Sequence, residues 1–207
     1  MGGRGGSSAR GGGGGAVGGP AFQKAMEIGE QIKDDRKESL YILDSSTGEI
    51  LASTKGGWNV NAAESIAYGK DNINIHNHPG AKIVRGRLTN VSIVAPSTAD
   101  LNSFAKSDVG QAIIVGETMG IRIRKTRGDA DWNGLVRHAK RVDSEGFNHA
   151  YSSSRQKFVD ANPSRFSSRS DALNWARKLQ KTVSADLANY YKRVGKDYGF
   201  SVDYWSY

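Results

Sequence analysis

Two histidines and one aspartate stand at a spacing that favours metal binding. His76 and His78 are separated by one residue at the end of an apolar run, and Asp100 closes a Ser-Thr-Ala-Asp sequence further along the chain. Histidines two residues apart on a regular strand point to the same side of the sheet, so both imidazoles can reach one ion. Two nitrogens and one carboxylate oxygen leave a fourth position open, as in catalytic zinc sites. The pattern therefore predicts a zinc site that activates water for hydrolysis.

The elements that must position these residues are predicted by local pattern. Residues 73–76 predict a buried strand that runs directly into the histidines, and Pro79 stiffens the exit from it. Ser97 to Asp100 have the form of a capping box, which predicts a helix to about residue 106. The carboxylate of Asp100 would then lie in the first helical turn, where the helix dipole favours a negative charge.

The rest of the chain mixes strands and helices, which predicts an α/β (α+β) fold. The expected elements are a helix from Pro20 to about Ile32, strands at 39–43 and 49–53 joined by a turn, a short helix at 61–68, a loop or short hairpin at 81–95, strands at 111–116 and 120–124, a helix that begins near residue 170, and a final extended segment at 198–207 that docks back. In the late helix, Trp175, Leu179, Val183, Leu187 and Tyr191 recur every four residues and predict an apolar face.

Composition limits the kind of protein. There is no cysteine, so any metal site must use His, Asp and Glu. No apolar run approaches the ~20 residues of a membrane span, and we expect a soluble, cytoplasmic protein without a membrane partner. Residues 1–20 hold 11 of the 26 glycines and predict a disordered Gly-rich tail.

The net charge of +8 is concentrated late in the chain. From residue 120 to residue 207 there are 17 Lys and Arg against 9 Asp and Glu, which equals the whole excess. We therefore expect a basic, mainly helical C-terminal region at 129–207. Its charge fits nucleic acid or an acidic protein, and it fits equally well a solvated basic face.

The motif around the histidines resembles a known family. The run His76-Asn77-His78-Pro79, followed by Pro96-Ser97-Thr98-Ala99-Asp100, is similar to the His-x-His-Pro…Ser-x-x-Asp signature of JAMM (MPN-domain) metallopeptidases. The His-Asn-His-Pro form is most similar to RadC-like and phage or mobile-element members. The resemblance covers roughly residues 21–128 and implies a JAMM-like metal-binding domain with a central curved sheet flanked by helices.

Carried to this sequence, the resemblance implies that His76, His78 and Asp100 bind zinc and that the Ser97 hydroxyl donates to the developing oxyanion. It also implies a peptide or isopeptide substrate, often a ubiquitin-like protein. One spacing departs from the family: 18 residues (79–96) separate His78 from Ser97, which indicates an inserted loop or a different serine. A structural role for the histidines, and a purely capping role for Ser97 and Asp100, are the alternatives.

The resemblance further implies a glutamate that takes a proton from water and passes it to the leaving amine. Glu38, directly before the strand at 39–43, occupies the matching place. Glu49 and Glu64 are weaker candidates, and Glu38 could instead be a solvated member of a charged stretch.

The leading hypothesis is thus a zinc-dependent hydrolase of the metallopeptidase or isopeptidase type. The alternative is a JAMM-like scaffold with little catalysis that binds nucleic acid or a host protein complex, as a phage counter-defence protein would. An HNH nuclease is disfavoured, because that motif spreads its residues over a ββα unit.

Overall fold

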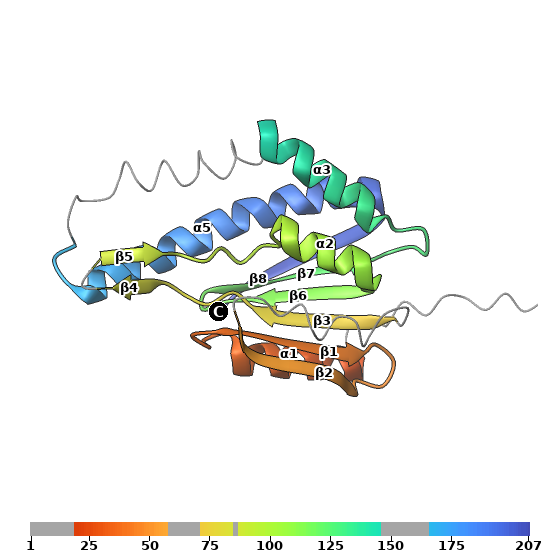
Figure 1. Ribbon diagram of the computed structural model, residues 1–207, viewed down its shortest axis with the longest axis horizontal. Coiled ribbons are helices and arrows are strands. Elements are labelled where there is room, and N and C mark those ends of the chain that lie inside the picture. The colour runs from red at the N-terminus through yellow and green to blue at the C-terminus, as the bar shows by residue number, and fades with distance from the viewer. Residues whose placement is uncertain (1–18, 58–70, 85–86, 146–165) are drawn as a thin grey trace, which may run out of the picture.

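The computed structural model describes residues 19–57, 71–84, 87–145 and 166–207 (Figure 1). Most of the expected tail, the expected helix at 61–68 and the candidate Glu64 lie outside these ranges. The elements are α1 (Pro20–Ile32), β1 (Glu38–Asp44), β2 (Ile50–Gly57), β3 (Asn72–Asn77), β4 (Lys82–Val84), β5 (Arg87–Asn90), α2 (Thr98–Ser107), β6 (Gln111–Val115), β7 (Met119–Lys125), α3 (Trp132–Glu145), α5 (Arg169–Gly195), a 3₁₀ turn (Lys196–Tyr198) and β8 (Phe200–Ser206).

Within the described ranges, four α-helices flank a six-stranded mixed sheet with strand order β2-β1-β3-β6-β7-β8. β3 and β6 are parallel, and the other neighbouring pairs are antiparallel. A parallel pair needs a crossover connection, and the segment that carries α2 supplies it. The predicted α+β class is confirmed at this level, and the likeness to the JAMM fold stays a prediction.

The sheet is covered by helices on both faces (Figure 1). α1 packs on one face through apolar side chains at helical spacing, and Pro20 begins this helix because its fixed φ suits a first turn. α2, α3 and α5 pack on the other face and share one apolar core with β6, β7 and β8. The predicted stripe of α5 faces this core: Leu179, Val183, Leu187 and Tyr191 are buried, and Trp175 packs against the cluster.

Residues after 128 contribute to this same sheet. β8, the expected docking segment at the aromatic end of the chain, pairs with β7 along its whole length. α5 packs across the sheet on the face that also carries α2. As a result, the late helix and the metal-binding motif share one side of the sheet.

For the expected loop or short hairpin at 81–95, the structure has two short antiparallel strands, β4 and β5, so the hairpin alternative is confirmed for that part of the segment. β4 and β5 pair only with each other, as a separate two-stranded sheet. Along the described helices, no stretch combines the length and the apolar character that a membrane crossing requires.

Candidate metal centre

β3 places both histidines on the face that α2 covers. The strand is buried throughout, and its side chains alternate between the two faces. Ile73 and Ile75 join the apolar cluster under α1, whereas His76 points to the opposite face and its ring lies 6.0 Å from that of Phe104 on α2. His78 follows the strand, and its backbone N–H still donates to Val115 O of β6 at 2.8 Å. The two imidazoles therefore emerge on one face, as the spacing predicted.

α2 delivers the carboxylate. Ser97 caps the helix: its hydroxyl accepts from Asp100 N at 3.1 Å, and Asp100 Oδ2 accepts from Ser97 N at 2.6 Å. This capping box confirms the predicted start of the helix. It also fixes Asp100 in the first turn, with its side chain 17% exposed.

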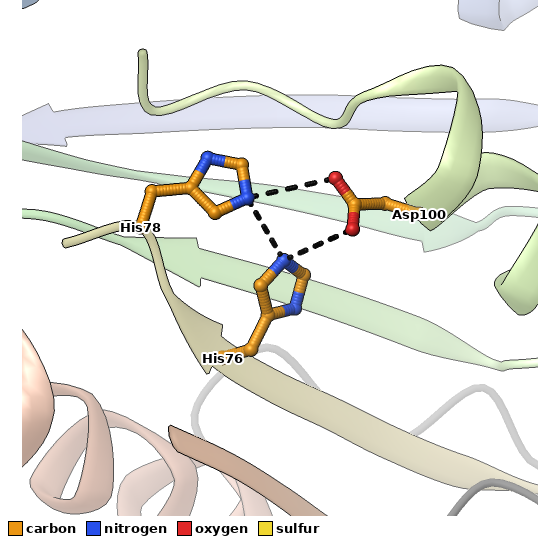
Figure 2. Close-up of side chains that lie close together, drawn as sticks. All are labelled: His76, His78 and Asp100. Atoms are coloured by element: carbon orange, nitrogen blue, oxygen red, sulfur yellow. Dashed lines mark hydrogen bonds and ion pairs between the residues drawn. The ribbon is translucent and has the colours of Figure 1, made fainter. Parts of the chain in front are cut away.

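The three side chains converge on one point (Figure 2). His76 Nε2 and His78 Nε2 are 3.2 Å apart. His76 Nε2 lies 3.6 Å from Asp100 Oδ1, and His78 Nε2 lies 3.5 Å from Asp100 Oδ2. In the part of the chain that the structure describes, these residues form a group that could hold a metal ion, with all ligand atoms within 4.8 Å of one another.

The far nitrogen of each imidazole is held by an oxygen acceptor. His76 Nδ1 lies 3.2 Å from Asn74 Oδ1, and His78 Nδ1 donates to Ile93 O at 2.6 Å. A ring that donates from Nδ1 keeps its lone pair on Nε2, and such outer partners fix the tautomer of metal-binding histidines. Both lone pairs thus face each other and the Asp100 carboxylate. Only a cation or a proton makes that arrangement favourable.

The electrostatics of the group follow from burial and from these contacts. Burial, opposed by the Asp100 charge, lowers the pKa of His76 to about 4. Burial also acts to lower the pKa of His78, but the Asp100 contact, the Ile93 carbonyl and the Glu38 charge outweigh it, and the pKa is raised. The pKa of Asp100 lies well below its usual range, because the two imidazoles and Ser97 outweigh the effect of burial. At neutral pH, therefore, the imidazole of His76 is uncharged and the carboxylate of Asp100 carries its negative charge.

Glu38, the expected general base, begins β1 and lies near the group. Leu40 of β1 pairs with His76 at this end of the two strands, and Glu38 and His78 each lie two residues beyond that pair. The alternation of side chains puts Glu38 on the same face as the histidines. Its carboxylate also contributes to the raised pKa of His78. Glu49, by contrast, lies in the turn after β1, at the other end of that strand.

The residue between the two histidines has a role that the sequence did not indicate. Asn77 is 0% exposed and points to the α1 face of the sheet. Its Oδ1 accepts from Ser39 N at 2.7 Å, and its Nδ2 donates to Asp35 O at 3.2 Å and to Lys37 O at 3.3 Å. Asn77 therefore ties the backbone on both sides of Glu38 to the strand that carries the histidines.

The outer partners Asn74 and Ile93 were also missed. Asn74 had a signal, since it lies two residues before His76 and so shares its face of the strand. Ile93 had none, because its carbonyl reaches His78 only through the fold.

Comparisons with protein-family models, with curated proteins and with solved structures gave no match.

Proposed function

We propose that the chain is a JAMM-like zinc-dependent hydrolase in which His76, His78 and Asp100 hold the metal. The observation that carries this proposal is the convergence of two Nε2 atoms and a carboxylate, with both Nδ1 atoms turned to oxygen acceptors. Bonds of about 2.0–2.2 Å at tetrahedral angles separate ligand atoms by about 3.3–3.6 Å. The two Nε2 atoms, 3.2 Å apart, are close to that separation, and each lies 3.5–3.6 Å from one of the two oxygens of the Asp100 carboxylate.

The donor types support a transition metal such as zinc over calcium or magnesium. Calcium and magnesium prefer sets made mainly of oxygen, whereas imidazole nitrogens with one carboxylate suit zinc. Three protein ligands are also the number found in catalytic rather than structural zinc sites. Zinc held here would lower the pKa of a bound water and so supply a nucleophile at neutral pH.

The chain's own residues would supply the proton transfers and the charge stabilisation. Glu38, on the histidine face of the sheet, would take a proton from water and hand it to the leaving amine. Ser97 holds Asp100 through the capping box, and we propose in addition that its hydroxyl donates to the developing oxyanion. The substrate class that accords with these roles is a peptide or an isopeptide bond, including the bond at the C-terminus of a ubiquitin-like protein.

The test is hydrolysis of a panel of fluorogenic peptides and of a ubiquitin C-terminal fluorogenic amide, with and without added zinc. The wild type is expected to cleave at least one probe and to lose activity with a chelator. Glu38→Gln is expected to lose at least about 100-fold in kcat, the order of a general acid–base contribution, and to keep its zinc. Activity of Glu38→Gln equal to wild type would remove the assigned base. Cleavage that survives complete zinc removal would remove the metal mechanism.

A second candidate function is supported by the outer surface of α5. Lys178, Lys181, Lys192 and Arg193 are all exposed on this helix. Exposed cations of this kind suit a polyanion, and binding to nucleic acid would then weaken steeply with salt. Titration of the full chain with single- and double-stranded DNA and RNA at several salt concentrations tests this. Absent or salt-insensitive binding would count against it.

A further inference from the structure

A segment without helix or strand connects the β4–β5 hairpin to α2 and is hydrogen-bonded to one of the two histidines. We call this segment, Ser92–Pro96, the strap. At one point its Ile93 carbonyl accepts the hydrogen bond from His78 Nδ1 at 2.6 Å. At its end the strap leads directly into Ser97, which caps the helix that carries Asp100. The strap is therefore bonded directly to one of the three ligands and continues into the helix cap that holds another.

Side chains of α5 bind alternate residues of the strap. The binding groups come from one side of the helix, although they lie about 90 residues away from the strap in sequence. The hydrogen bonds run from Gln180 Nε2 to Ser92 O (2.8 Å), from Val94 N to Ser184 Oγ (2.8 Å) and from Tyr191 OH to Pro96 O (3.2 Å). The carbonyl between the first two of these contacts, that of Ile93, is the one that binds His78.

Two of these side chains are polar residues inside an apolar helix face. Gln180 is 2% exposed and Ser184 is 0% exposed, beside the apolar residues Leu179 and Val183. Buried polar groups destabilise a fold unless they are hydrogen-bonded. The backbone N–H and C=O groups of the strap also need hydrogen-bond partners, because the strap belongs to no sheet. The hydrogen bonds between α5 and the strap meet the requirement of the buried side chains and that of the strap backbone together. Gln180 also accepts from Thr118 Oγ1 at 2.8 Å, which ties it to the β6–β7 turn.

We propose that Ser184 and Gln180 are positioning residues of the metal centre. They hold the strap so that the Ile93 carbonyl stays on His78 Nδ1, which keeps the lone pair of His78 on Nε2 and directed at the metal. In this proposal α5 positions a ligand of the metal centre as well as contributing to the apolar core. This inference rests on the proposed zinc site and adds to it the residues that set its affinity.

The test compares zinc affinity with folding stability in four variants of the full chain. Zinc is titrated against a chromophoric chelator, cobalt spectra report the ligand geometry, and urea unfolding of the metal-free chain reports stability. Ser184→Ala removes the acceptor for Val94 N, and Gln180→Met removes the donor to Ser92 O. Each is expected to weaken zinc binding about tenfold, the lower end of what loss of an outer partner costs a metal site, and to change the cobalt spectrum.

Two controls separate positioning from general destabilisation. Val183→Ala opens a cavity one residue away on the same helix and is expected to lose stability with unchanged zinc affinity. Ser184→Thr keeps the hydroxyl but adds a methyl group to a buried site, so it is expected to lose stability and keep wild-type zinc affinity and cobalt spectrum.

The results have distinct meanings. Weaker zinc binding in Ser184→Ala or Gln180→Met, with wild-type affinity in Val183→Ala, supports the inference. If wild type and both of these variants bind zinc equally, the inference fails and the proposed zinc site stands. If zinc affinity falls in Val183→Ala as much as in Ser184→Ala, the effect is one of stability and the inference also fails. A wild-type chain that binds no zinc overturns both proposals.

Discussion

Replacing Asn77 tests whether the strand that carries the histidines also fixes the start of β1. Asn77 is fully buried and makes three hydrogen bonds with the backbone on both sides of Glu38. In Asn77→Ala all three are lost, and the N–H of Ser39 is left buried without the acceptor it has now. The carbonyls of Asp35 and Lys37 lose a donor, but they lie in a part-buried loop where water can replace it.

The magnitude follows from these bonds. A neutral intramolecular hydrogen bond contributes about 1 kcal/mol net, and an unpaired buried amide costs about 1–3 kcal/mol. Counting the Ser39 amide fully and the two part-buried carbonyls at the low end, we expect Asn77→Ala to lower the free energy of unfolding by about 3 kcal/mol. For a domain whose total stability is about 5–15 kcal/mol, this is a large fraction.

The assay is equilibrium urea unfolding of the chain in the presence of a chelator, so that metal binding does not add to stability. The matched control is Asn102→Ala on α2. Asn102 is the same residue type, but its Nδ2 donates to Thr98 O, at 2.8 Å and one turn away in its own helix. The control is expected to lose less than about 1 kcal/mol. If Asn77→Ala lowers the free energy of unfolding by less than about 1 kcal/mol, or if both variants lower it equally, Asn77 does not hold the backbone around Glu38 as assigned.

Three further predictions concern the ligands. Asn74→Ala removes the acceptor beside His76 Nδ1 and should weaken zinc binding by about 10- to 100-fold, measured by chelator competition; unchanged affinity would exclude Asn74 as the outer partner. Protons compete with zinc for His78, whose pKa is raised, while His76 stays neutral down to about pH 4. The logarithm of the apparent zinc affinity should therefore rise by about one per pH unit between about pH 4 and the His78 pKa and level off above it, and a slope of two near pH 6 would contradict this order of protonation. Ser97→Ala removes the helix cap and should lower the free energy of unfolding by about 1 kcal/mol, with weaker zinc binding because Asp100 loses its fixed turn; urea unfolding and zinc titration that show neither effect would argue against the capping role.

The local parts of the site could be predicted from the sequence because they depend on near neighbours. Alternation along a strand places His76 and His78 on one face, and a capping box places Asp100 in a first helical turn. Both features can be recognised from residues that lie two or three apart in the sequence, and the structure contains both. That the two meet on one face of the sheet was a hypothesis from the donor types, which the family resemblance reinforced, since no local rule relates residue 78 to residue 100.

The supporting contacts could not be predicted, because they join distant segments. Ser184 binds a residue 90 positions away, and Asn77 binds one 38 positions away. In the sequence, Ser184 is a small polar residue directly after Val183 of the apolar stripe. A serine at such a position is as common on the exposed side of a helix as on the buried side. Which polar residues of a buried face find partners depends on the path of the strap and on the crossing of α5, and neither has a signature in local pattern.

The metal content of the purified chain tests the central claim most directly. After incubation with zinc and removal of the excess by gel filtration, elemental analysis of the wild type should give about one zinc per chain. His78→Ala should retain little or none, because two ligands remain, and Glu38→Gln should retain the wild-type amount, because Glu38 is assigned to proton transfer. A wild-type chain without zinc, or equal zinc in wild type and His78→Ala, would contradict the account.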